Sequence, residues 1–240
     1  MNKFMINSHL LLMLLFSNSV FADGDNWNSY YLGGSLGYAD GTAKNNEKGG
    51  TSFNGLDIGK YSTDGMQYGI YGGRNWSINQ RIVLGVELGF GNLNIKNSRQ
   101  LDLWKDVGAA GDSVATTTNG LFIEAAGRLG FKILDEKAMI YLKAGFIQTD
   151  VKQKFEDTCN TGTCGSFITT SNGERQSGPL LGFGIEYNLM ENINISLDYT
   201  HYNFGNVTQT SYESAATFID YKFSHNLDID TLRVGTSYNF

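Results

Sequence analysis

Histidine, cysteine and basic residues are scarce in this chain of 240 residues. It contains three histidines, two cysteines and one proline. Downstream of residue 22 the histidines are His201 and His225, so a zinc site built from Cys and His is improbable. Lys and Arg number 18 against 24 Asp and Glu, and the formal net charge is -6. This balance argues against nucleic acid as a partner, because phosphate binding needs a clustered excess of cations.

Long apolar runs are also lacking, except for one near the N-terminus. Lys3 precedes the apolar run Leu10–Phe16, and Ala22 supplies a small residue for cleavage. The run is too short to cross about 30 Å of hydrocarbon as a helix. We therefore expect residues 1–22 to be a signal peptide that is cleaved after Ala22, and residues 23–240 to be one exported domain.

Glycine and aromatic residues are abundant, with 30 Gly, 13 Tyr and 15 Phe. Eight segments alternate between apolar residues on one face and glycine or polar residues on the other, a period of two that indicates β-strands. The mean hydropathy of -0.25 is compatible with a membrane barrel, whose strands average apolar and polar positions. The segments lie near residues 29–39, 66–76, 84–90, 119–133, 140–146, 181–187, 194–200 and 231–240.

The connections between these segments alternate between long and short. Short turns are expected near 77–81, 134–138 and 189–192, and long loops near 40–65, 96–118, 152–176 and 205–226. An even strand number with short turns on one side and long loops on the other is typical of outer-membrane barrels. The sequence therefore predicts an all-β fold, an eight-stranded antiparallel up-and-down transmembrane β-barrel in the bacterial outer membrane.

A soluble barrel of the lipocalin type is the alternative, with its apolar face turned inward. The second face consists of glycine and charged residues, which are too small and too polar to line an apolar ligand core. Aromatic residues also recur near the strand ends, as interfacial girdles require, for example Tyr38, Trp76, Phe131 and Tyr187. Both features favour the membrane barrel.

Several segments resemble the porin-like outer-membrane family related to the opacity proteins. They are the stretch from Tyr31 to Tyr38, Val83–Glu87, Gly182–Tyr187 and the C-terminal stretch from Thr231 to Phe240. The resemblance implies an eight-stranded barrel that anchors surface loops, and it implies no enzyme. In such proteins the last strand, here ending with Tyr238 and Phe240, is read by the barrel insertion machinery as an assembly signal.

Seven charged residues fall on the inward face of the predicted strands. An eight-stranded interior is just wide enough for side chains to fill, and buried charges are tolerated when they are paired. We therefore expect a network of ion pairs that plugs the lumen. Neighbouring strands would pair Arg128 with Glu87 and Glu124 with Lys143, while Glu186 and Asp198 would need Lys143 or Arg233. The seven residues are Glu87, Glu124, Arg128, Lys143, Glu186, Asp198 and Arg233.

The sequence gives weaker indications of a disulfide, of haem binding and of catalysis. Cys159 and Cys164 lie close together in the third expected loop, and in an exported chain they are expected to form a small disulfide. Haem binding by His201 and His225 is a minority hypothesis. Catalysis by a carboxylate pair such as Glu87 and Glu186 would need a substrate cleft that a filled barrel lacks. No cofactor is expected.

These observations predict a surface protein with a structural or interaction role, which presents four extracellular loops on a charge-plugged barrel. Its expected partners are outer-membrane lipid, the insertion machinery and a host or envelope ligand at the loops. The alternative is a small porin-like channel for solutes.

Overall fold

The computed structural model describes residues 26–47, 57–101, 112–157, 167–170, 174–212 and 220–240. In these residues no helix is long and apolar enough to cross a membrane. The strands are β1 (Tyr30–Glu47), β2 (Asp57–Ser77), β3 (Ile82–Leu101), β4 (Asp112–Ile133), β5 (Ala138–Asp157), β6 (Phe167–Thr170), β7 (Glu174–Met190), β8 (Ile193–Tyr212) and β9 (Asp220–Asn239).

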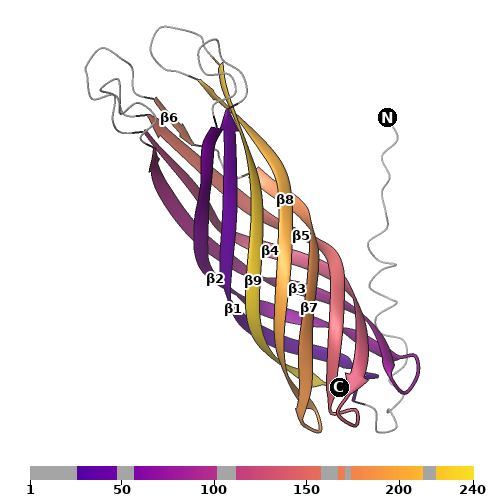
Figure 1. Ribbon diagram of the computed structural model, residues 1–240. Helices are drawn as coiled ribbons and strands as arrows, with labels where there is room; N and C mark the ends of the chain where they lie inside the picture. Colours follow the sequence, from indigo (N-terminus) through magenta and orange to yellow (C-terminus); the bar gives the residue numbers. More distant parts are fainter. Residues whose placement is uncertain (1–25, 48–56, 102–111, 158–166, 171–173, 213–219) are drawn as a thin grey trace, which may run out of the picture.

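Eight of these strands form a closed antiparallel barrel. Each is hydrogen-bonded to its neighbours in the order β4-β3-β2-β1-β9-β8-β7-β5, and a further pairing of β4 with β5 closes the ring. The short strand β6 pairs only with the end of β5. The ribbon shows an elongated barrel of strongly tilted strands (Figure 1). The predicted fold class, an eight-stranded antiparallel up-and-down barrel, is confirmed.

Three short turns lie at the same end of the barrel as the C-terminus (Figure 1). They join β2 to β3, β4 to β5 and β7 to β8, where the sequence predicts turns. In the second of them Leu134, Asp135 and Glu136 all adopt positive φ angles, and the Lys137 amide donates a hydrogen bond of 3.1 Å to the Leu134 carbonyl. By the usual arrangement of such barrels, this is the periplasmic end.

The strands are longer than the sequence predicts, and the bounds of the four expected loops are wrong. For example, β1 and β2 remain paired as far as Asn46 opposite Asp57, inside the expected loop 40–65. The strands likewise continue into 96–118, 152–176 and 205–226. The outward-facing apolar residues that mark a membrane strand stop before these segments, so the apolar alternation does not indicate where the strands end.

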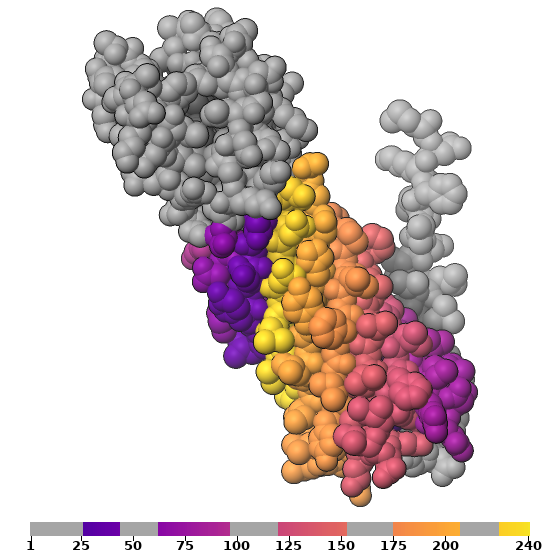
Figure 2. Space-filling view, in the orientation of Figure 1, coloured from indigo at the N-terminus to yellow at the C-terminus, as the bar shows by residue number. Residues whose placement is uncertain are grey.

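The outward face near the periplasmic end is apolar. Leu32, Ile70, Leu88 and Phe183 are each more than half exposed there. On β3 the outward apolar residues run from Ile82 to Phe90. That length of tilted strand spans roughly 23 Å, close to the apolar band of outer-membrane barrels. This part of the surface is suited to lipid. In the space-filling view the strands form a continuous wall (Figure 2).

The polarity reverses in the half of the barrel farther from the short turns. There the outward residues are polar, such as Asp40, while the adjacent inward residue Ala39 is fully buried. An apolar core fills the interior of this half, with every member at most 4% exposed. A strand segment with water outside and an apolar core inside has the pattern of a soluble barrel. The core consists of Ala39, Ala43, Leu93, Ile95, Phe122, Ile147, Val151, Leu180, Tyr202, Phe204, Leu227 and Ile229.

A second, smaller cluster closes the periplasmic end. Trp27, which precedes β1, is 1% exposed and packs with Val83, Met139 and Tyr141. Its indole nitrogen donates a hydrogen bond of 2.6 Å to the carbonyl of Glu136 in the turn after β4. The interior therefore has three layers: this cluster, the polar middle described next, and the apolar core beyond it.

Candidate functional site: the charged lumen

The middle layer contains the seven charged residues that the sequence places on the inward face. They lie on six different strands, and all are between 2% and 7% exposed. They are Glu87 on β3, Glu124 and Arg128 on β4, Lys143 on β5, Glu186 on β7, Asp198 on β8 and Arg233 on β9.

Arg128 organises one half of this network. Its Nη2 atom lies 2.7 Å from Glu186 Oε2, and its Nη1 atom lies 3.3 Å from Glu87 Oε2. Nη1 also donates a hydrogen bond of 2.8 Å to the Tyr31 hydroxyl, which donates one of 3.0 Å to Glu87. The guanidinium stacks on the ring of Tyr141, with 4.1 Å to the ring centroid. Both carboxylates are thus paired with the same cation, as buried charges require.

Arg233 organises the other half. Its Nη1 atom lies 2.9 Å from Glu124 Oε1, and its Nη2 atom lies 2.9 Å from Asp198 Oδ1. The same Asp198 oxygen lies 3.1 Å from Lys143 Nζ. Lys143 also approaches Glu87 Oε1 at 3.9 Å and so links the two halves. Four carboxylates and three cations therefore form one connected network.

The predicted pairs are only partly present. Arg128 pairs with Glu87, and Asp198 with both Lys143 and Arg233, as the sequence predicts. The predicted pairing of Glu124 with Lys143 is wrong, because Glu124 pairs with Arg233. The partners expected for Glu186, Lys143 or Arg233, are also wrong.

Contacts across the lumen explain these differences. Glu186 pairs with Arg128, whose strand β4 is not a neighbour of β7. Arg128 and Lys143 stand directly opposite each other on β4 and β5, where like charges repel. Their side chains therefore pair with carboxylates elsewhere in the interior, which a rule based on neighbouring strands does not foresee.

Sequence reasoning missed the uncharged members of the site. The Tyr202 hydroxyl donates a hydrogen bond of 2.9 Å to Glu124 Oε2 and accepts one of 3.1 Å from Gln67. Tyr31 bridges Arg128 and Glu87 as described above. The signal was present in the alternation, which puts each of these three residues on the inward face. What the alternation lacks is any indication of which carboxylate they meet.

Inward-facing glycines make room for these large side chains. A Cβ atom added to Gly89 would lie 2.7 Å from Cγ of Glu124, and one added to Gly184 would lie 2.6 Å from the ring of Tyr141. Such distances are too short for ordinary packing, so a larger residue at either position would displace the side chain that the glycine accommodates. The abundance of glycine on this face is therefore a consequence of the filled interior.

Very little space remains in the network. The gap enclosed by Tyr71, Glu87, Arg128, Glu186 and Arg233 has a volume of about 10 Å³. This is at most the space for a single water molecule. Among the described residues no group of three or more His, Cys, Asp or Glu is placed to hold a metal ion.

The other residues that the sequence singles out lie outside the charged network. His201 faces outward and its Nδ1 atom lies 2.8 Å from Asp230. Tyr238 and Phe240 are exposed at the periplasmic end, with their rings 5.0 Å apart at 71°. The expected signal peptide and the pair Cys159 and Cys164 lie outside the described residues, and so does the side chain of His225.

Comparison with known proteins agrees with this architecture. Residues 8–240 match the family described as outer membrane protein beta-barrel domain. The 31 kDa outer-membrane immunogenic protein of Brucella melitensis is 27% identical over 228 residues, which cover 91% of this chain and 85% of that protein.

Solved structures of other outer-membrane proteins are similar to this chain at low identity. The outer membrane protein OprG from Pseudomonas aeruginosa is 13% identical with a TM-score of 0.54, and the match covers 91% of this chain and 99% of that one. The outer membrane protease OmpT from Escherichia coli is 11% identical with a TM-score of 0.41, covering 89% and 97%. At this similarity no activity transfers to the chain.

Proposed function

The chain belongs to the outer-membrane β-barrel family, and we propose that within it this protein is a closed surface scaffold that does not conduct solutes. It is an outer-membrane barrel by its family and its fold. The finer function rests on the interior. A pore needs a continuous wet path, and an interaction scaffold needs only a stable wall and an exposed part. The two roles therefore make different demands on the lumen.

The filled lumen is the observation that carries the proposal. The charged network leaves a gap of only about 10 Å³, and each of its seven side chains is nearly fully buried. An apolar core lies on one side of this layer, and the cluster around Trp27 lies on the other. A solute would have to displace all three layers. This argues against the porin-like alternative.

The exposed half of the barrel supports the interaction role. Beyond the lipid band the strands continue with polar residues outside and an apolar core inside, so the scaffold rises into the extracellular medium as a rigid body. Exposed parts on a rigid scaffold are where binding residues concentrate. The Brucella relative is described as immunogenic, which fits exposure at the cell surface. A host or envelope ligand is the proposed partner of this half.

Catalysis is not part of the proposal. The carboxylates that could act as a pair, Glu87 and Glu186, are both bound to Arg128 and lie beside no substrate-sized cleft. His201, the one histidine whose side chain the structure describes, faces outward with Asp230. A hydrolase would need a nucleophile or base facing a cavity. We find no such arrangement in the described part of the chain.

Single-channel recording on refolded protein in planar bilayers tests the proposal. Heat-modifiable migration on gels establishes that the recorded sample is folded. We expect no steady conductance from folded protein, and antibodies raised against it should stain intact cells. Regular current steps would favour the channel instead. Staining that requires permeabilised cells would contradict the surface role.

A further inference from the structure

Among the residues that the structure describes, a single cation interrupts the lipid-facing surface near the periplasmic end. Arg74 lies on the outward face of β2, between Gly72 and Trp76. Its guanidinium stacks on the ring of Tyr30, 4.3 Å from the centroid, and lies 5.6 Å from that of Trp76. No ion pair joins Arg74 to any residue that the structure describes, including the C-terminal carboxylate of Phe240.

The position of Arg74 fits the membrane interface. A charged residue on the lipid face of a barrel costs about 2–4 kcal/mol at the bilayer midplane and about 0–1 kcal/mol near the interfaces. Tyr30 and Trp76 are residue types that mark the interface. Stacking uses the face of a guanidinium, while its N–H groups point outward in the plane, where they suit the oxygens of a phosphate. Arg74 is therefore placed at headgroup level with donors to spare.

An apolar groove begins beside Arg74 and runs toward the middle of the lipid band. Its volume is about 930 Å³. Tyr30 and Phe240 lie at its periplasmic end, and Gly72 is one of its lining residues, where an added Cβ atom would lie 3.3 Å from Cδ1 of Leu32, another lining residue. A groove of this size and character suits a hydrocarbon chain. Its apolar walls are Leu32, Ile70, Val86, Leu88, Phe90 and Ile123.

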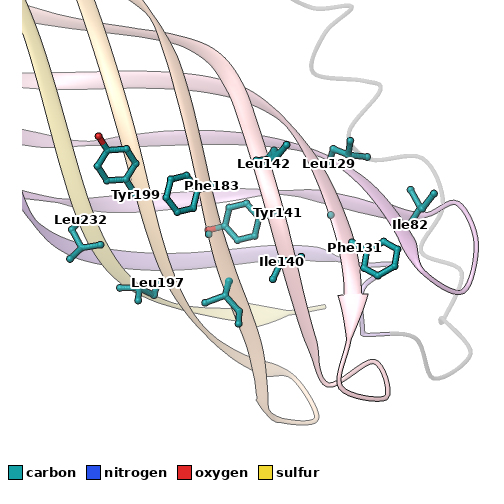
Figure 3. A pocket seen from close by; sticks show the side chains of 13 residues that line it. Ile82, Leu129, Phe131, Ile140, Tyr141, Leu142, Phe183, Leu197, Tyr199 and Leu232 are labelled. Atoms are coloured by element: carbon teal, nitrogen blue, oxygen red, sulfur yellow. The ribbon is translucent and has the colours of Figure 1, made fainter.

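A second groove offers a comparison within the same barrel. It has a volume of about 760 Å³ and lies over strands β3, β4, β5, β7, β8 and β9 (Figure 3). Leu129, Leu142 and Phe183 are among the apolar side chains that line it. None of its lining residues is charged. Both grooves are lined by uncharged residues, and the first has in addition the Arg74 guanidinium stacked on its lining residue Tyr30.

We propose that Arg74 and its groove form a binding site for one phospholipid of the periplasmic leaflet. The phosphate is bound by the Arg74 guanidinium, and an acyl chain lies in the groove over Gly72. Charge complementarity favours this occupant over a second copy of the chain. A symmetric dimer through this face would bring two Arg74 side chains into one interface whose lining residues include no Asp or Glu.

Native mass spectrometry of the full-length barrel, released from detergent with dioleoyl phosphatidylglycerol added, tests the site. Wild-type protein should retain one phospholipid. Arg74→Gln should weaken retention about five-fold, the effect of one cation at a membrane surface. Arg74→Lys should keep part of it. Gly72→Val should reduce retention with the cation intact, because its side chain enters the groove. Heat-modifiable migration establishes that each variant is folded.

Two comparisons decide the outcome. Arg81 is an exposed cation in the nearby turn between β2 and β3, so Arg81→Gln removes an equal charge away from the groove. It should leave retention unchanged. Dioleoylglycerol, which lacks the phosphate, should bind more weakly and be insensitive to Arg74→Gln. Equal effects of the two Arg→Gln variants, equal retention of dioleoylglycerol, or a lipid-free dimer would each overturn the proposal.

Discussion

Replacing Arg128 with alanine removes the cation that holds one half of the lumen network. Arg128 is 4% exposed and is the nearest cation to both Glu186, at 2.7 Å, and Glu87, at 3.3 Å. In the variant Glu186 has no cation within ion-pair distance among the described residues, and Glu87 keeps only the long contact with Lys143 at 3.9 Å. The stacking on Tyr141 is also lost.

The expected loss of stability is large because the charges stay buried. Removing one partner of a buried ion pair typically costs about 3–5 kcal/mol, since the other charge stays desolvated. Arg175 provides the control, because its side chain is 69% exposed and lies 3.6 Å from Asp150. An exposed pair of this kind contributes about 0–1 kcal/mol. Arg128→Ala should therefore lower the free energy of unfolding several kcal/mol more than Arg175→Ala.

Urea unfolding of the barrel refolded into lipid vesicles measures both variants against wild type. A double variant, Arg128→Met with Glu186→Gln, should recover part of the loss, because the second change removes the carboxylate left without a partner. If Arg128→Ala and Arg175→Ala are within about 1 kcal/mol of each other, the lumen is hydrated and the reasoning fails. A double variant that is less stable than Arg128→Ala alone would also refute it.

Two further predictions concern assembly and the segment outside the described residues. Deleting Phe240 should reduce insertion into the outer membrane while leaving export and cleavage after Ala22 intact, because an unassembled barrel exposes strand edges that lipid cannot satisfy; normal heat-modifiable folding of the deletion in cells would contradict this. Cys159 and Cys164 should be linked in the exported protein, and a variant with both changed to Ser should still fold, since the bond closes only a short loop; thiol labelling of intact cells without reductant would show the linkage to be absent.

The barrel itself was predictable from alternation, because the period of two puts each residue on a definite face. The outward residues Leu84 and Phe90 on β3, and Glu87 on its inward face, are placed correctly by this rule alone. The seven lumen charges follow in the same way. Closure into eight strands then follows from the even number of segments and the short turns.

The partners inside the lumen were not predictable from alternation. Arg128 reaches Glu186 and Arg233 reaches Glu124 across the interior, at distances set by strand tilt and by glycines such as Gly89 that leave space for the side chains. These are properties of the closed barrel and not of any pair of strands. Trp27 was missed for a similar reason. Trp27 precedes the first strand and packs over the periplasmic opening of the barrel, which exists only when the barrel is closed.

The reversal of polarity along each strand fixes the depth of the barrel in the membrane. On three neighbouring strands Asp64, Asp40 and Asp230 stand in one outward row, each directly opposite the next. Like charges in such positions repel, so the row needs water around it and cannot sink into lipid. The apolar band begins on the periplasmic side of this row, at Tyr38 and Met66. Moving the barrel toward the periplasm would place the aspartates in lipid, and moving it toward the cell exterior would expose the apolar band to water. The alternation of apolar and polar residues therefore specifies the fold, and the point where its polarity reverses specifies the position of the barrel in the membrane.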